Sequence, residues 1–169
     1  MSTDEECDSV CPIARALSVV GDQWTLLIMR EIGLGVHRFD DIQALTGASS
    51  FLLTTRLKRM EKEGLVERRL YNQHPPRHEY HATPKGKALD EVLLVLRAWS
   101  MKWQSKSAHE APAVNLVDRR TKKVIDANWR PPPNRPPFTF ADSDGTIGRA
   151  FSSERAAMRR KFSQSRRRG

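Results

Sequence analysis

The sequence predicts an α+β fold that is mostly helical. Its central part indicates which type of domain the fold contains. Residues 38–50 and 51–62 each carry apolar side chains at three- and four-residue spacing, which predicts two amphipathic helices. Gly47 lies in the short turn between them. Residues 66–83 read as two strands joined by a loop that holds two adjacent prolines. Two helices around a glycine-containing turn, followed by a hairpin, are the pattern of a winged helix-turn-helix domain.

The second of these helices has two different faces. Its apolar stripe, which we expect in the core, consists of Leu53, Leu57 and Met60. The opposite face has no carboxylate and carries Phe51, Thr55, Lys58, Arg59 and Lys62. Such a face suits the DNA major groove, because lysine and arginine can contact phosphates while the first helical turn contacts base edges. A solvated basic helix face is the alternative interpretation.

The first helix of the pair is shorter and lies within residues 38–50. Asp40 or Asp41 can cap its N-terminus, and Ile42 and Leu45 have the spacing of buried residues. We expect the glycine that follows to end it.

The N-terminal part is predicted to begin with a disordered segment and to continue as two helices. Residues 1–10 contain four acidic side chains and no basic one. Cys11 then opens a helix, since Pro12 fits the first helical position. A buried stripe is expected at Ile13, Ala16, Leu17 and Val20, and a second stripe follows over residues 24–32.

At this point the order of residues resembles a known family, the HxlR-type winged helix-turn-helix transcriptional regulators. The similar motifs are Cys11-Pro12-Ile13, Gly21-Asp22-Gln23-Trp24-Thr25-Leu26-Leu27-Ile28, Arg38-Phe39-Asp40-Asp41-Ile42, Arg56-Leu57 with Glu63-Gly64-Leu65-Val66, and the wing Pro75-Pro76-Arg77-His78-Glu79-Tyr80 with Thr83-Pro84-Lys85-Gly86. The resemblance covers about residues 10–103 and implies a bacterial, homodimeric DNA-binding regulator. Two positions depart from the family pattern: Gln23 stands where lysine is usual, and Phe51 stands where lysine or another polar residue is common.

The candidate DNA contacts combine the helix face with the wing that the resemblance implies. They are Arg38, Ser49, Ser50, Phe51, Thr55, Lys58, Arg59, Lys62, Arg77 and His78. Phe51 can lie against a thymine methyl group, and Thr55 can reach the next base step. The competing interpretation is that Phe51 packs inward with Leu52 as part of the core.

Residues 85–106 form the most apolar predicted helix, and its stripe is wider than a small winged domain needs. It contains Leu89, Val92, Leu93, Leu96, Trp99 and Trp103, and Val95 and Met101 extend it. Large aromatic side chains on one helix suit an interface between subunits. Together with the family resemblance, this predicts a homodimer through Ile13, Leu17, Leu93, Leu96, Trp99 and Trp103. Packing within one subunit would use part of the same stripe. The winged domain with its dimerisation helices is thus expected over residues 11–108.

The two cysteines allow a chemical switch but no disulfide framework. Cys11 precedes a helix N-terminus, where the helix dipole favours a thiolate and hence reaction with oxidants or electrophiles. Cys7 could serve as its resolving partner, and a structural cysteine is the alternative. His74, His78 and His81 lie close in sequence on the predicted wing, but we expect no metal site there.

The C-terminal third is predicted to be an appendage. Residues 109–148 read as a small extension: a hairpin over 113–127, five prolines over 130–137, then a short strand at Phe138 and Phe140 before a turn. This piece is too small to own a core, so we expect it to pack on the winged domain and to border a ligand pocket. Residues 149–169 carry eight basic and one acidic side chains, which predicts a short helix over about 153–162 and a disordered arginine end that attracts phosphates or serves solubility.

These features lead to one functional hypothesis and its alternatives. We expect a sequence-specific transcriptional regulator, a repressor rather than an activator, that binds an inverted-repeat operator as a homodimer in the cytoplasm and is switched at Cys11 or by a small-molecule effector. A winged-helix protein-interaction module with general nucleic-acid affinity is the alternative. The net charge of +9 favours a polyanionic partner, and no catalytic constellation, cofactor motif or apolar run of membrane-spanning length of about 18 residues is recognised.

Overall fold

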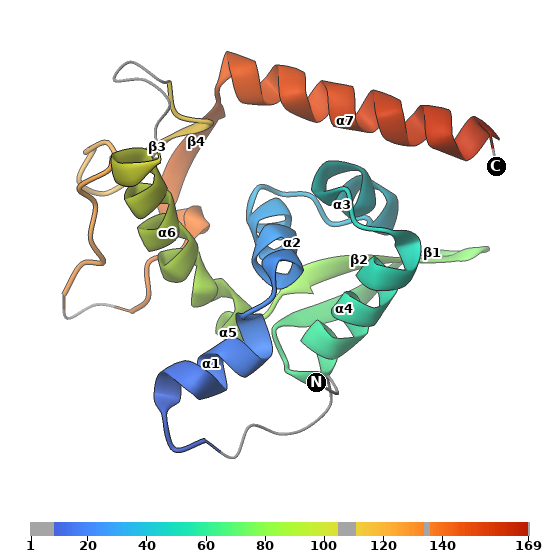
Figure 1. Ribbon diagram of the computed structural model, residues 1–169, viewed down its shortest axis with the longest axis horizontal. Coiled ribbons are helices and arrows are strands. Elements are labelled where there is room, and N and C mark those ends of the chain that lie inside the picture. The colour runs from blue at the N-terminus through green and yellow to red at the C-terminus, as the bar shows by residue number, and fades with distance from the viewer. Residues whose placement is uncertain (1–8, 105–110, 134–135, 169) are drawn as a thin grey trace.

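The computed structural model describes residues 9–104, 111–133 and 136–168 of the 169-residue chain. Most of the N-terminal segment that was expected to be disordered lies outside these ranges. Two parts follow one another: a winged helix-turn-helix unit and a C-terminal extension (Figure 1). The elements of the first part are α1 (Pro12–Val20), α2 (Gln23–Gly33), α3 (Phe39–Thr46), α4 (Ser50–Lys62), β1 (Val66–Gln73), β2 (Pro76–Ala82), α5 (Pro84–Lys87) and α6 (Leu89–Trp103). The extension consists of β3 (Val114–Asp118), η1 (Phe140–Asp142), β4 (Ser143–Ile147) and α7 (Arg149–Arg168).

The winged unit is organised around one apolar core. The predicted inner stripe of α4 is fully buried, and it meets Ile28 and Met29 of α2 and Ile42 of α3. The 3.6-residue period of the sequence therefore identified the inner face of each helix correctly.

The turn between α3 and α4 begins at Gly47, as the sequence predicts. Gly47 follows α3 with φ +76°, a left-handed conformation in which a side chain would be strained. Ser49 then caps α4, because its Oγ accepts the N–H of Leu52 at 3.2 Å. The prediction that Asp40 or Asp41 caps α3 is wrong. Arg38 occupies the N-cap position, and both aspartates lie in the first helical turn.

The wing is a two-stranded antiparallel sheet, and it projects beyond α3 and α4 in Figure 1. β1 and β2 pair from Val66 opposite Ala82 outward, with an irregularity between Leu70 and Asn72. The segment before α3 holds the sheet on its other side, where the Tyr80 N–H donates to the His37 carbonyl at 2.8 Å. Only Val66 of β1 is buried, so most of this strand faces solvent, whereas most of β2 is half-buried.

The helices that flank the winged unit differ from the prediction in two respects. α1 begins after Cys11 with Pro12 in its first turn, as expected, but none of its residues is buried. The helix predicted over 85–106 is broken at Ala88 into α5 and α6. One side of α6 buries Leu94 and Ala98 against the extension, while the predicted aromatic stripe lies mostly on another, exposed side.

The extension packs on α6, but its strands pair differently from the predicted hairpin. β3 pairs antiparallel with β4, and the predicted partner stretch contributes one isolated bridge, between Val117 and Val124. The stretch expected to be a turn after residue 141 is instead β4, because its backbone completes a ladder with β3. A second apolar cluster contains Leu94 of α6 together with Leu116, Ile125 and Phe138 of the extension. The extension therefore shares its core with α6, as predicted for a segment too small to have a core of its own.

Two acidic side chains of α6 fasten the extension to that helix. Glu91 Oε1 accepts the Phe138 N–H at 2.6 Å, and Asp90 Oδ2 accepts the Phe140 N–H at 3.0 Å. Burial raises the pKa of Asp90 to about 6, although the Phe140 hydrogen bond and the charge of Lys87 act in the opposite direction.

The basic end of the chain is one long helix. α7 starts four residues before the predicted position and continues through the arginines that the sequence suggested to be disordered. It lies across α3 (Figure 1). Near its start, Phe151 is buried, and Arg155 Nη1 donates to Glu31 Oε2 at 2.6 Å. Glu31 is fully buried in α2, so this ion pair anchors α7 to the winged unit.

Within the described ranges, the model contains no helix both long and apolar enough to cross a membrane.

Candidate nucleic-acid interface

The outer face of α4 is an open surface with a shallow hollow of about 430 Å³. Five of the predicted DNA contacts surround this hollow, together with Leu52 and Arg56: Phe51, Thr55, Lys58, Arg59 and Lys62. The structure therefore brings together the side chains that the helical period placed on one face.

Phe51 is the most unusual side chain of this surface. It is 84% exposed, whereas its neighbour Leu52 is half-buried against the core. The competing prediction that Phe51 is a core residue is therefore wrong: the core is already filled on the opposite side of α4. Thr55 stands one turn further along, and its hydroxyl donates to the Phe51 carbonyl at 3.0 Å.

The two serines before and at the start of α4 have different surroundings. The Ser49 hydroxyl is engaged as the helix cap. Ser50 is exposed and borders a groove of about 570 Å³ between α3, the start of α4 and the C-terminal half of α7.

The basic side chains of α4 fall into two groups. Lys58 and Lys62 are exposed, and neither has a salt bridge among the described residues. Arg59 is half-buried, and its Nη2 donates to the Ser18 carbonyl of α1 at 2.5 Å. Arg59 therefore also joins α4 to α1, a role that the sequence did not indicate.

Arg56 is a second link between α4 and the N-terminal helices. Its Nη1 lies 3.4 Å from Asp22 Oδ2, and Asp22 caps α2 by accepting the backbone N–H groups of Trp24 and Thr25 at 2.9 Å. Partial burial would raise the pKa of Asp22, but the Thr25 hydrogen bonds and the Arg56 charge lower it below its usual value. The carboxylate is therefore kept ionised, and it positions the inner edge of α4.

Three further candidates lie on or beside the wing. Arg77 is exposed and His78 half-buried, both on β2. Arg38 stacks with its guanidinium carbon 4.6 Å from the Tyr71 ring centroid, and its Nε lies 3.4 Å from Glu79 Oε1. Arg38 is exposed, and these contacts hold its guanidinium beside the wing.

The sequence predicted that the basic C-terminal residues attract phosphates, but not that they form a helix that packs beside α3 and the start of α4. Lys161, Phe162 and Arg166 line the groove that Ser50 borders. Arg166 Nη1 donates to Asp40 Oδ2 at 2.7 Å, and Arg159 Nη2 lies 3.8 Å from Asp41 Oδ1. The signal was present in the sequence, because Phe151, Arg155, Met158 and Phe162 recur at three- and four-residue spacing.

The predicted dimer residues are mostly exposed in the single chain. Exposed fractions are 70% for Ile13, 58% for Leu17, 46% for Leu96, 52% for Trp99 and 67% for Trp103. Leu93 does not belong with them: it is half-buried and packs against the core of the winged unit. The buried stripe expected on α1 is likewise an exposed one, since Ala16 is also exposed and Val20 only half-buried.

The candidate sensing residue is accessible. Cys11 is exposed at the N-cap position of α1, two residues before Ile13. Cys7 lies outside the described residues. No group of three or more His, Cys, Asp or Glu side chains in the described part of the chain could hold a metal ion.

Comparison with known proteins identifies the family. A family model described as HxlR-like helix-turn-helix matches residues 19–108. An uncharacterized HTH-type transcriptional regulator of Mycobacterium tuberculosis is 36% identical over 104 residues, which cover 62% of this chain and 65%, just under two thirds, of that protein. The uncharacterized HTH-type transcriptional regulator YvaP of Bacillus subtilis is 36% identical over 96 residues, which cover 56% of this chain and 89% of YvaP.

Solved structures show the same fold. PA1607, a candidate transcription factor, has a TM-score of 0.63 and 27% identity, and the match covers 84% of this chain and 96% of PA1607. The redox regulator HypR in its reduced form has a TM-score of 0.53 and 27% identity, with 55% of this chain and 95% of HypR covered. Since the family model spans more than half of the 169 residues, the chain belongs to the HxlR-like helix-turn-helix family.

Proposed function

We propose that this protein is a DNA-binding transcriptional regulator that acts as a homodimer on an inverted-repeat operator, most simply as a repressor that blocks a promoter. The observation that carries this proposal is the outer face of α4. It joins an exposed aromatic ring and hydroxyl groups in the first turns to exposed lysines in the later turns, without a carboxylate in the hollow they surround. This order matches base readout followed by phosphate contact.

Two further groups support a role of the wing and the helix start in the same interface. Arg77 is exposed on the wing strand, and Arg38 lies at its base. Ser50 is exposed at the N-terminus of α4, where backbone N–H groups are available to a phosphate.

The proposed dimer rests on the apolar side chains that the single chain leaves exposed. Trp99 and Trp103 lie on one exposed side of α6, and Ile13 and Leu17 are exposed on α1. Large exposed aromatic side chains are typical of interface centres. A two-fold axis through such a surface would place two α4 helices about one DNA turn, roughly 34 Å, apart. Sedimentation of the wild type and of Trp99→Asp tests the homodimer. We expect the wild type to sediment as a dimer and Trp99→Asp as a folded monomer.

The DNA-binding proposal is tested by selection from a random DNA pool, followed by anisotropy titrations at moderate salt. We expect enrichment of an inverted repeat and much weaker binding to a scrambled sequence. Lys58→Ala combined with Lys62→Ala should weaken binding to both sequences, since phosphate contacts carry no sequence information.

A matched control removes two exposed cations elsewhere. Arg120→Ala combined with Lys123→Ala has the same charge change on the extension. Equal losses of affinity in the two double variants would show that only net charge matters, and would favour a general nucleic-acid affinity of a protein-interaction module.

A second candidate function is a redox or electrophile response through Cys11. Its support is the exposed thiol beside the proposed dimer surface of α1, and the structural likeness to the redox regulator HypR. We expect Cys11→Ser to bind the operator normally and to lose any release caused by peroxide or a quinone. Equal release from the wild type and the variant would remove Cys11 from the response.

A further inference from the structure

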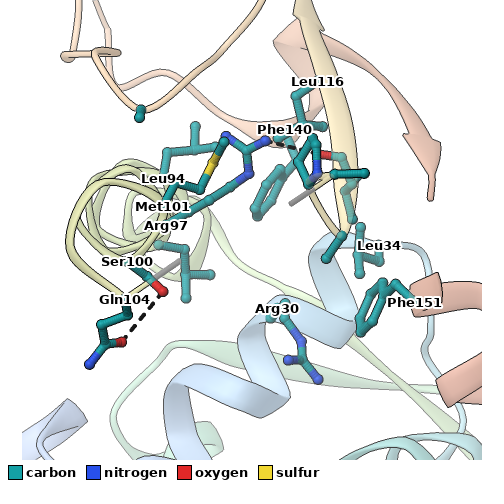
Figure 2. A pocket seen from close by; sticks show the side chains of 16 residues that line it. Arg30, Leu34, Leu94, Arg97, Ser100, Met101, Gln104, Leu116, Phe140 and Phe151 are labelled. Atoms are coloured by element: carbon teal, nitrogen blue, oxygen red, sulfur yellow. Dashed lines mark hydrogen bonds between the residues drawn. The ribbon is translucent and has the colours of Figure 1, made fainter. Parts of the chain in front are cut away.

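A cavity of about 490 Å³ lies between the winged unit and the extension (Figure 2). Its wall comes from α2, α6, β3, η1 and the first turn of α7. Most of the lining is apolar, including Leu34, Leu94, Met101, Leu116, Phe140 and Phe151. This volume is within the usual range of small-molecule sites, roughly 300–1,000 Å³.

Two arginines line the cavity, and their charges are compensated differently. Arg30 has a partner, because its Nη2 lies 2.6 Å from Glu31 Oε1. Arg97 has no salt bridge to any residue in the described ranges: its Nη1 donates to the Ile125 carbonyl at 2.7 Å and its Nη2 to the Val114 carbonyl at 2.9 Å. Burial lowers the pKa of Arg97, which Asp126 only partly offsets.

A half-buried guanidinium bonded only to neutral carbonyls still has unused donors. Arginine carries five N–H groups in a fixed plane, and two of those of Arg97 are engaged with backbone oxygens. A carboxylate is the group that such a fork binds best. Figure 2 shows Arg97 and Met101 projecting from α6 toward the extension, with Phe140 and Leu116 facing them.

We propose that this cavity binds a small apolar monocarboxylate, with the acid group at Arg97 and the hydrocarbon part between Met101, Leu116 and Phe140. Half of the lining residues, among them Leu116 and Phe140, belong to the extension, which lies beyond the part of the chain that the family model matches. Ser100 and Gln104 of α6 also line it and supply polar contacts for a substituent.

The test uses two ligands of nearly equal shape, 1-naphthoate and the neutral 1-naphthylmethanol, titrated calorimetrically into the full chain. We expect 1-naphthoate to bind with 1:1 stoichiometry per chain and at least about tenfold more tightly than the alcohol, which corresponds to roughly 1.4 kcal/mol for the charge-assisted contact. Equal affinities of the acid and the alcohol would overturn the assignment of Arg97, and no heat for either would overturn the site.

Variants locate the binding without relying on Arg97 alone. Met101→Trp should fill the cavity and abolish binding, whereas Lys102→Trp, one residue along on the exposed side of α6, should leave it unchanged. Arg97→Gln should reduce the affinity for the acid to that for the alcohol. If Arg97→Gln does not fold, because Arg97 also holds two backbone carbonyls, Met101→Trp still decides: unchanged 1-naphthoate binding in that variant would place the ligand elsewhere. The titration contains no DNA, so its result does not depend on the function proposed above.

Discussion

α4 and α7 are both basic helices, but their charges are used differently. On α4, Lys58 and Lys62 project into solvent with no ion pair in the described structure. On α7, three arginines meet acidic side chains of the winged unit: Arg155 meets Glu31, Arg159 meets Asp41 and Arg166 meets Asp40. The number of positive charges therefore does not distinguish a helix that can contact DNA from a helix that is docked. The two helices are distinguished by whether carboxylates of the winged unit lie beside their basic side chains.

The pairing of basic side chains with carboxylates also changes along α7. The Arg155 pair is buried, the other two pairs are solvent-exposed, and Arg160, Lys161 and Arg167 are exposed without a salt bridge among the described residues. α7 is thus an anchor at its start and a basic surface toward its end. Substitutions and a truncation separate these roles, beginning with the largest expected effect.

Arg155→Met should destabilise the fold most. It leaves Glu31 fully buried with Arg30 as its remaining partner, and removal of one member of a buried pair costs about 3 kcal/mol of unfolding free energy. Chemical denaturation measures this loss. Arg160→Met, one of the exposed α7 positions, should stay within about 0.5 kcal/mol of the wild type. Similar effects of the two substitutions would mean that α7 has no anchored end.

Phe51→Ala should weaken binding to the selected operator by about 1–3 kcal/mol and relax the base preference at one position per half-site. Because Phe51 is 84% exposed, the melting temperature should remain close to that of the wild type. Binding to random DNA should change little. A variant with a lower melting temperature and an unchanged base preference would show that the ring serves the fold.

Truncation after Gln164 removes the last arginines of α7 and leaves Phe151 and Arg155 in place. If these arginines bind phosphates beside the start of α4, affinity should fall equally for operator and random DNA. The slope of log affinity against log salt should shrink by roughly 0.9 for each phosphate that the truncated helix no longer binds. An unchanged slope would assign the end of α7 entirely to docking. Truncation after Gly148 would not separate phosphate binding from docking, because it also removes the buried anchor.

Arg166→Gln should have the smallest effect on stability. Its ion pair with Asp40 is exposed on both sides, and such pairs contribute between about 0 and 1 kcal/mol. Thermal melts at low and high salt measure the contribution, which should disappear at high salt. A destabilisation comparable to that of Arg155→Met would contradict the distinction between the two ends of α7.

The sequence predicted those features of the fold that depend on neighbours in the chain. The inner face of α4, the end of α3 at Gly47 and the proline that opens α1 follow from spacing and local backbone chemistry, whereas the cap at Ser49 was not predicted. Of the proposed DNA contacts, the α4 set was found because one helical period places it on one face.

The features that were missed depend on residues far apart in sequence. Asp40 and Asp41 were expected to cap α3, yet they are partners of arginines more than a hundred positions later. β3 pairs with β4 across a long connection instead of forming the local hairpin. Arg97 could have been noticed as the single cation within the apolar run of α6, but its two carbonyl partners lie on the extension and are visible only in three dimensions.

Burial of the Asp90 carboxyl, which accepts the Phe140 N–H, makes attachment of the extension sensitive to protons. The Asp90 carboxyl has a pKa of about 6 in the folded chain against 3.8 in the unfolded one, so the fold binds this proton more tightly. The resulting stabilisation is complete below about pH 3.8 and is lost as the pH rises through about 6. Asp90→Asn keeps an acceptor for the Phe140 N–H without the buried charge. Denaturant titrations should therefore show a higher unfolding free energy for this variant than for the wild type at pH 7, and nearly equal values at pH 4. At neutral pH the charged Asp90 thus holds the extension less firmly than an uncharged side chain would.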